Sequence, residues 1–291
     1  MKKILAYVTP DTVPSMFDIV VAHDSGADIV MPYGSVDENH VEDIIHGCVF
    51  TRRKEDLKNT AVFIGGKNSR LSEALLRKSL EVIGQLPAQF RISIGVDPEG
   101  ANTTSSACVA KIADAFDVSG SKAAVVAGTG PVGERSAALL ANEGAEVTLT
   151  SRKIESAKAT CRRIRDMYDC KAEPAVAASQ SEIEKVLSTA EIVLATGSEG
   201  VQLVQERSWL KYDNVKVIAD CNAVPPYGIE GVRPTDNGKV DGRIRFGALT
   251  IGGLKMKVQY RIVEDLFKSN DKVINLGEAY AIAKAILKTK R

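Results

Sequence analysis

The feature that most constrains the fold of this chain is a glycine-rich turn between an apolar run and a helical pattern. Residues 122–127 have the character of a buried strand, and helical spacing extends from the turn to Gly144. In a G-x-G-x-x-G turn the first glycine permits a tight bend, the second lets a pyrophosphate approach the backbone, and the third lets helix and sheet pack closely. The sequence therefore predicts a dinucleotide site at Gly128, Thr129, Gly130, Pro131, Val132 and Gly133.

The end of the next expected strand indicates which dinucleotide is bound. NAD-binding proteins place an acidic side chain there, about 20 residues after the loop, on the ribose 2′-hydroxyl. This chain has Ser151, Arg152 and Lys153 instead, which can hydrogen-bond, grip bidentately and neutralise a 2′-phosphate. The alternative is that Arg152 and Lys153 are only solvated residues at the start of a helix. Cations at a helix N-terminus are electrostatically unfavourable without a bound anion, which weighs against this alternative. NADP is the expected cofactor, with weaker use of NAD left open.

Two later strand ends supply candidates for the nicotinamide side of the site. The segments 195–198 and 220–223 each follow a compact apolar run. Ligands of doubly wound sheets bind at the carboxyl ends of the strands, so Thr196, Gly197 and Asn222 are predicted to line this part. The alternative for either turn is a plain connection between elements.

The rest of the sequence repeats the alternation of strands and helices. In the N-terminal part, β-type runs separated by helical patterns lie at residues 2–8, 28–31, 60–64 and 91–96. This alternation predicts a mostly parallel sheet. Two helical patterns follow the last expected strand, and we expect them to complete the N-terminal domain. The expected fold class is α/β, with a Rossmann-type doubly wound parallel sheet at 105–253 and a second α/β domain formed by 1–104 and 254–291.

Charge and composition exclude several classes of function. Lys and Arg number 38 against 37 Asp and Glu, so no net field would hold nucleic acid or an anionic membrane. No apolar run approaches the ~18 residues of a membrane span, and the first run is too short for a signal peptide, so we expect a cytoplasmic protein. The five cysteines lack a C-x-x-C pair and the three histidines lack an H-E-x-x-H pattern, so no metal is expected.

Further motifs outside the glycine loop carry a resemblance that covers nearly the whole chain. They are Pro14-Ser-Met-Phe-Asp18, Phe63-Ile-Gly-Gly66, Asn102-Thr-Thr104, Ala219-Asp-Cys-Asn-Ala223 and Ile251-Gly-Gly-Leu-Lys255. With them the sequence resembles the NAD(P)-dependent methylene-tetrahydromethanopterin dehydrogenases, including the methylene-tetrahydromethanopterin/methylene-tetrahydrofolate dehydrogenase of methylotrophic bacteria. Such enzymes pass a hydride from the methylene bridge of a C1-carrying reduced pterin to NADP. The resemblance implies this substrate, an oxidoreductase of one-carbon metabolism, and a closed homo-oligomer such as a trimer or hexamer.

The resemblance also implies where the pterin binds. Family positions assign Phe17, Asp18, Thr103, Thr104 and Lys255 to the cleft, with Asp18, Thr104 and Lys255 as the catalytic candidates. Phe17 would stack on the pterin or an aryl ring, and the threonine hydroxyls would hydrogen-bond the pterin edges. A cation beside a forming cation opposes the reaction, so Lys255 is expected to bind a pterin carbonyl or to orient a carboxylate such as Asp18. The alternative for these side chains is a core or capping role.

Other functions remain open at this point. Tetrahydrofolate differs from tetrahydromethanopterin by small groups near the reacting ring, and no residue decides between the two carriers. A shikimate-type dehydrogenase would need an acid–base pair such as Lys67 and Asp97, whose spacing gives it no support. A non-catalytic NADP-binding regulator would bind the cofactor without turnover. The first domain lacks the Y-x-x-x-K pattern of the folate dehydrogenase/cyclohydrolases, so hydrolysis of the methenyl product is not expected.

Overall fold

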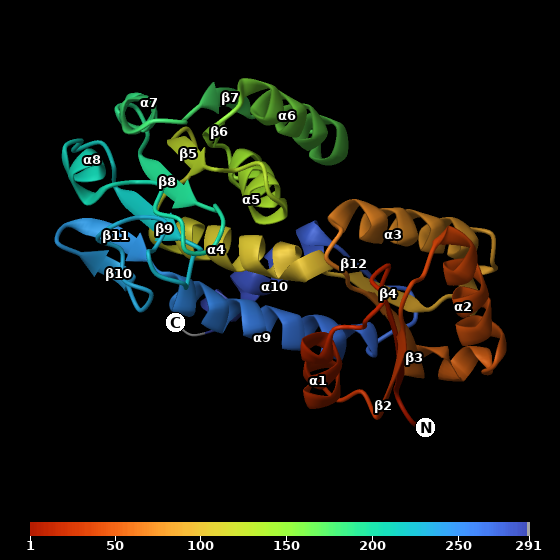
Figure 1. The fold of residues 1–291 in the computed structure, drawn as a ribbon. Coiled ribbons are helices and arrows are strands. Elements are labelled where there is room, and N and C mark those ends of the chain that lie inside the picture. Colours follow the sequence, from red (N-terminus) through yellow and green to blue (C-terminus); the bar gives the residue numbers. More distant parts are fainter. Residues whose placement is uncertain (290–291) are drawn as a thin grey trace. The chain divides into compact units, whose positions relative to one another are not determined.

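The computed structural model describes residues 1–289, which form two compact units with a sheet in each (Figure 1). Unit 1 comprises Met1–Thr103 and Met256–Ile282, and unit 2 comprises Thr104–Lys255 and the described residues from Ala283. The chain passes between the units within three helices, namely α4 (Ala101–Ala115), α9 (Ala248–Leu266) and α10 (Leu276–Lys288). Within residues 1–289, every helix is too short or too polar to cross a lipid bilayer.

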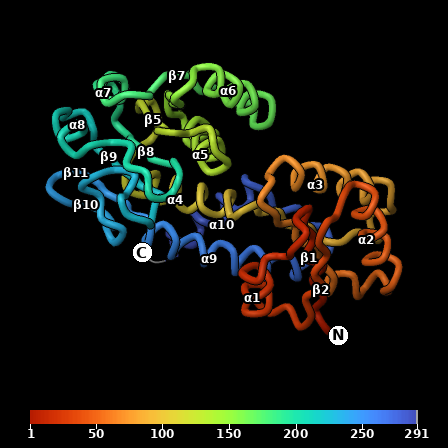
Figure 2. The backbone as a smooth tube through the Cα atoms, in the orientation of Figure 1, coloured from red at the N-terminus to blue at the C-terminus, as the bar shows by residue number. Residues whose placement is uncertain are grey.

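Unit 1 is built on a five-stranded parallel sheet in the order β12-β4-β3-β1-β2. Its strands are β1 (Ile4–Val8), β2 (Ile29–Tyr33), β3 (Thr60–Ile64), β4 (Ser93–Val96) and β12 (Val273–Ile274). Its helices are α1 (Met16–Asp24), α2 (Glu38–Phe50) and α3 (Ser69–Gly84), with short 3₁₀ turns at Lys54–Asn59, Ala88–Phe90 and Pro98–Gly100. Figure 2 traces this path along the backbone.

The core of unit 1 follows from the alternation of side chains along its strands. Val62 and Ile94 point to one face, where Ile45 of α2 and Leu75 of α3 pack against them. On the other face, Gly95 makes room for α9, because a Cβ there would lie 3.2 Å from the Leu266 side chain. The helices that cover the two faces therefore come from the N-terminal segment and from the C-terminal part of the chain.

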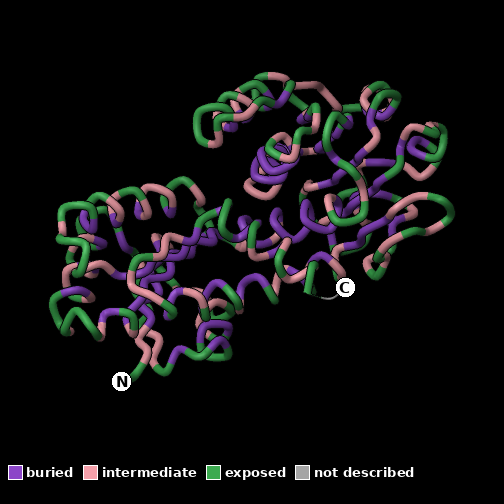
Figure 3. Tube along the Cα trace, turned by 180° about the vertical axis from the view of Figure 1, so that it is seen from behind, coloured by how far each residue is buried: buried purple, intermediate pink, exposed green. Residues whose placement is uncertain are grey.

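Unit 2 is a seven-stranded sheet in the order β10-β11-β9-β8-β5-β6-β7, parallel except for the β10–β11 pair. Its strands are β5 (Lys122–Val126), β6 (Glu146–Ser151), β7 (Glu173–Val176), β8 (Ile192–Ala195), β9 (Val217–Asp220), β10 (Asn237–Val240) and β11 (Arg243–Phe246). Its helices include α5 (Pro131–Asn142), α6 (Ile154–Tyr168), α7 (Gln180–Leu187) and α8 (Glu206–Leu210). Buried positions concentrate in the inner strands of the two sheets, namely β1, β3 and β4 in unit 1 and β5, β8 and β9 in unit 2, and Figure 3 colours buried residues purple.

The strand order of unit 2 confirms the expected Rossmann-type fold. From β5 the chain adds β6 and β7 on one side and then β8, β9 and β11 on the other, which is the order of a doubly wound sheet. The reversal point lies between β5 and β8, and ligands of such sheets bind in the crevice there. β10 is an additional antiparallel edge strand.

The boundary between the two units falls within the C-terminal helix α10, whereas the sequence-based expectation placed the whole helix in the N-terminal domain. All of 254–291 was expected to join 1–104, yet α10 from Ala283 clusters with unit 2. Within that unit, Lys284 Nζ donates to Glu143 Oε1 at 2.7 Å, just after α5 ends. A pattern of apolar spacing identifies the helix but does not show which sheet its last turns pack against.

Candidate functional site

The turn between β5 and α5 leaves open the space where a phosphate group is expected. A Cβ at Gly128 would lie 2.9 Å from the Leu149 side chain, and a Cβ at Gly133 would lie 2.5 Å from the Gly128 Cα atom. A Cβ at Gly130 meets no described atom within 4 Å, and its φ of −80° suits any residue. The protein itself therefore does not require glycine at 130, whereas a bound pyrophosphate against the backbone would.

Two hydrogen bonds from backbone amides fix this turn against the end of β6. The Gly128 amide donates to the Thr150 carbonyl at 3.0 Å, and the Ala127 amide donates to Thr150 Oγ1 at 3.1 Å. Gly130 is the N-cap of α5 and offers no side chain to its amides. The first turn of such a helix presents N–H groups and the positive end of the helix dipole, so it suits a dinucleotide pyrophosphate.

A cavity of about 390 Å³ collects many of the predicted cofactor residues. It lies where β5, β6 and β8 end, and the predicted residues among its lining are Thr129, Gly130, Ser151, Arg152, Thr196 and Gly197. The lining also includes side chains that sequence reasoning missed, namely Ala177, Ile183, Val201 and Leu203. They are apolar and belong to no motif, so only the fold reveals that they wall the same space.

The end of β6 is positively charged and lacks an acidic partner for a ribose hydroxyl. Arg152 and Lys153 are exposed, and the Lys153 amide donates to Ser151 Oγ at 3.4 Å. Lys153 is the N-cap of α6 and forms no side-chain capping bond within the described structure. The nearby Glu155 is paired with Lys158 at 3.3 Å. Two cations at the positive end of a helix are unfavourable unless an anion binds beside them.

The turn after β9 is held together by its own polar side chains. Asp220 is 2% exposed, and its Oδ1 and Oδ2 accept the amides of Asn222 at 3.0 Å and Ile229 at 2.8 Å. Asn222 in turn accepts the Val224 amide at 2.9 Å and donates to the Pro226 carbonyl at 3.3 Å. Burial raises the pKa of Asp220 above its ordinary value. Asn222 is not among the lining residues of the cofactor cavity, and its place beside nicotinamide stays a prediction.

Replacing Asp220 by alanine is expected to destabilise unit 2 by about 3 kcal/mol, because buried amides at 222 and 229 lose their acceptor. Thermal unfolding followed by circular dichroism measures this loss. Asp236→Ala is the comparison, since that carboxylate accepts the Arg233 amide in an exposed turn and its removal is expected to cost under about 1 kcal/mol. Equal losses for the two variants would contradict the assigned role of Asp220.

In unit 1, two buried side chains hold the carboxylate of Asp18. The Tyr7 hydroxyl donates to Asp18 Oδ2 at 2.9 Å, and Gln259 Nε2 donates to Asp18 Oδ1 at 2.8 Å. Tyr7 and Gln259 are each 1% exposed, whereas Asp18 is partly exposed and the adjacent Phe17 is 49% exposed. Burial and the Asp18 charge raise the pKa of Tyr7 far above its ordinary value, so its hydroxyl stays a donor. Sequence reasoning found Asp18 and Phe17 but missed both donors.

Thr103 lies in a buried cap at the start of α4. Its hydroxyl donates to Asp97 Oδ2 at 2.6 Å, and Asp97 Oδ1 accepts the amides of Asn102 at 2.9 Å and Thr103 at 3.2 Å. Thr103 is fully buried and Asp97 is 1% exposed. A carboxylate engaged in this way is poorly placed for the acid–base role that a shikimate-type mechanism would give Asp97.

The other predicted pterin residues fall outside unit 1. Thr104 and Lys255 are partly exposed and belong to unit 2, in α4 and α9. Their catalytic roles with Asp18 therefore remain predictions from the resemblance. Among residues 1–289, no three His, Cys, Asp or Glu side chains are grouped so that they could hold a metal ion.

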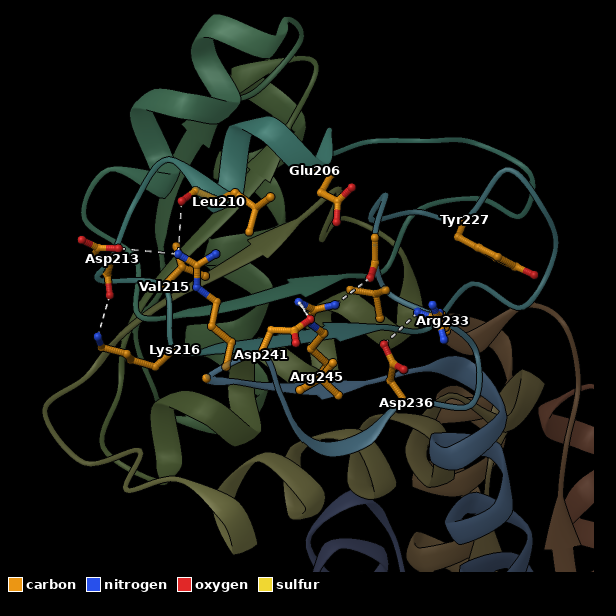
Figure 4. A pocket seen from close by; sticks show the side chains of 15 residues that line it. Glu206, Leu210, Asp213, Val215, Lys216, Tyr227, Arg233, Asp236, Asp241 and Arg245 are labelled. Carbon is orange, nitrogen blue, oxygen red and sulfur yellow. Dashed lines mark hydrogen bonds and ion pairs between the residues drawn. The ribbon is translucent and has the colours of Figure 1, made fainter.

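A separate cavity of about 1100 Å³ lies beside α8 and the β10–β11 hairpin (Figure 4). Two of its charged side chains fasten the hairpin, since Arg243 donates to the Leu210 carbonyl at 3.2 Å and Arg245 donates to the Gly231 carbonyl at 3.1 Å. Both guanidinium groups also lie about 5 Å from the Trp209 ring centroid, at 5.2 and 5.0 Å. These contacts give the arginines a structural role, so the cavity is not assigned to the cofactor.

Comparison with known proteins identifies the family. Residues 16–99 match the family model described as methylene-tetrahydromethanopterin dehydrogenase, N-terminal, and residues 115–223 match a putative NAD(P)-binding model. The Bifunctional protein MdtA of Methylorubrum extorquens is 38% identical over 286 residues, which are 97% of this chain and 98% of that protein. The chain belongs to the methylene-tetrahydromethanopterin dehydrogenase family.

A second curated relative supports the family assignment of this dehydrogenase, and two solved structures share its fold. The NAD(P)-dependent methylenetetrahydromethanopterin dehydrogenase of the same organism is 29% identical over 299 residues, covering 97% of this chain and 98% of that protein. Ornithine carbamoyltransferase from Pyrococcus furiosus aligns with a TM-score of 0.53 at 10% identity, over 90% of this chain and 83% of that one. Shikimate 5-dehydrogenase from Listeria monocytogenes gives 0.50 at 12% identity, over 97% and 96% of the two chains. At these identities the two solved structures show the fold alone.

Proposed function

We propose that this protein oxidises methylene-tetrahydromethanopterin to methenyl-tetrahydromethanopterin, with NADP as the hydride acceptor. Family membership supports the pterin substrate, because a relative that aligns with this chain over 98% of its own length carries this activity in its name. The observation that carries the cofactor assignment is the open space at Gly130 beside Ser151 and Arg152 in one cavity. The residues present therefore fit a phosphorylated dinucleotide.

In this mechanism NADP supplies the chemistry by accepting a hydride, and the protein supplies binding and orientation. The amides of the first turn of α5 would hold the pyrophosphate, and Ser151 with Arg152 would hold the 2′-phosphate. Thr196 and Gly197 would line the nicotinamide side, while the apolar side chains of Ile183 and Leu203, which line the same cavity, would exclude water from the bound cofactor. The methylene carbon lies between two nitrogens that stabilise the resulting cation, so the hydride step needs no general base, and rate comes from near-attack positioning.

The preference for NADP rests on charge at the end of β6. An acidic residue at this place would repel a 2′-phosphate, and the chain has Ser151, Arg152 and Lys153 there. Arg152 can donate two parallel hydrogen bonds to a 2′-phosphate, a group that NAD lacks. NADP is therefore proposed as the main cofactor, with NAD used more weakly. No metal ion is proposed to take part in the reaction.

The test follows the absorbance of reduced nicotinamide while the purified protein is offered methylene-tetrahydromethanopterin or methylene-tetrahydrofolate, each with NADP and with NAD. We expect the highest kcat/KM with the methanopterin substrate and NADP. A higher kcat/KM with methylene-tetrahydrofolate would move the assignment to the folate carrier. If none of the four combinations produced reduced nicotinamide while calorimetry showed NADP binding, the result would favour the non-catalytic regulator. Light scattering tests the homo-oligomer that the resemblance implies, and cell fractionation tests the cytoplasmic location.

A further inference from the structure

The Asp18 carboxylate is fixed in direction by donors from two distant parts of the chain. Tyr7 lies in β1 and Gln259 lies in α9, 241 residues beyond Asp18, and each donates to a different carboxylate oxygen. Because both oxygens have a buried donor, rotation of the carboxylate would break at least one charge-assisted hydrogen bond. The group is therefore held in one plane while the residue keeps some exposure to solvent.

This arrangement leaves one buried polar atom without a hydrogen-bond partner among the described residues and restricts the residue type at one neighbouring position. Gln259 Oε1 is buried and has no hydrogen-bond partner among the described residues, and an unsatisfied buried acceptor is destabilising. The Tyr7 side chain as a whole requires glycine at position 65, because a Cβ there would collide with its hydroxyl oxygen and lie 2.8 Å from its Cζ atom. Leucine at 259 and phenylalanine at 7 would fill similar volumes without a polar atom to satisfy. Such costs are typical of groups that are retained for function rather than for packing.

We propose that Tyr7 and Gln259 are positioning residues that aim the Asp18 carboxylate at the aminopyrimidinone edge of the pterin. That edge presents two neighbouring N–H donors, one on the ring and one on the exocyclic amino group. An ionised carboxylate has about four lone-pair positions, so after accepting from Tyr7 and Gln259 it retains one on each oxygen. A carboxylate already held in plane loses less freedom when it accepts both donors. This inference rests on the proposed function, since it takes a pterin as the ligand.

The test replaces each donor by an apolar residue of similar size. In Tyr7→Phe and in Gln259→Leu we expect the Kd for tetrahydromethanopterin, measured by calorimetry, to rise about tenfold, the scale of one lost hydrogen bond to a charged group. The KM for methylene-tetrahydromethanopterin is expected to rise by a similar factor, while kcat and the KM for NADP change less than about twofold. A matched control is Ser79→Ala, which removes a fully buried hydroxyl that donates to the Leu75 carbonyl in α3. It is expected to lower thermal stability and leave pterin binding unchanged.

A double-mutant cycle separates positioning from general stability. In an Asp18→Asn background, Tyr7→Phe is expected to weaken pterin binding by less than about twofold, because the group it positions is already altered. A further tenfold loss in that background would overturn the inference, and so would an unchanged Kd in both single variants. If the wild type binds tetrahydromethanopterin but does not oxidise its methylene form, the proposed function fails while the Kd values still test the role of Tyr7 and Gln259. If it neither binds nor oxidises the pterin, both fail.

Discussion

Gly133→Ala is expected to destabilise unit 2 by about 3 kcal/mol and to lower the unfolding temperature by about 6 °C or more. The added Cβ would lie 2.5 Å from Gly128 Cα, 2.6 Å from the Gly128 carbonyl oxygen and 2.5 Å from Thr196 Oγ1. Two of these atoms belong to the backbone, so the turn and α5 must move apart. Because the same turn forms the pyrophosphate site, affinity for NADP is expected to fall as well. Calorimetric unfolding and NADP titration measure the two effects.

Gly130→Ala is the matched control for this prediction, because it adds the same methyl group three residues earlier in the same turn. No described atom lies within 4 Å of the new Cβ, so the unfolding temperature is expected to change by only about 1 °C. The KM for NADP is nevertheless expected to rise at least about tenfold, because the methyl group enters the space of the pyrophosphate. Equal stability losses in both variants, or unchanged NADP binding by Gly130→Ala, would contradict the roles assigned to these glycines.

The fold was predictable from the sequence to the extent that its determinants are local. The close approach of Gly133 to Gly128, five residues earlier, is local and appears in the structure, whereas their contacts with Leu149 and Thr196 arise only in the folded sheet. The Rossmann-type order of unit 2 follows from repeated strand–helix alternation, and the structure confirms it. The attachment of the α10 end at Lys284 depends on tertiary packing, which periodicity alone does not encode.

The site was only partly predictable, because several of its residues act through distant partners. Tyr7 and Gln259 carry no motif, and their common partner Asp18 becomes visible only when β1, α1 and α9 are folded together. Conversely, Thr103 and Asn222 carry polar groups in conspicuous motifs, yet their side chains bond to their own turns. A polar residue after a strand has the same sequence signal whether it binds a ligand or caps a turn.

Arg152→Ala is expected to raise the KM for NADP about 10- to 100-fold and to change the KM for NAD by less than about twofold. The guanidinium lines the cofactor cavity and can donate two bonds to a 2′-phosphate, at about 1.5–3 kcal/mol for a charge-assisted bond. Steady-state kinetics with both cofactors measures the ratio. Arg165→Ala is the control, because the side chain of this exposed arginine of α6 forms an ion pair with the neighbouring Asp166 at 3.1 Å. This variant is expected to leave both KM values unchanged. Equal losses for NADP and NAD would place Arg152 in general binding of the dinucleotide and remove the structural reason for preferring NADP.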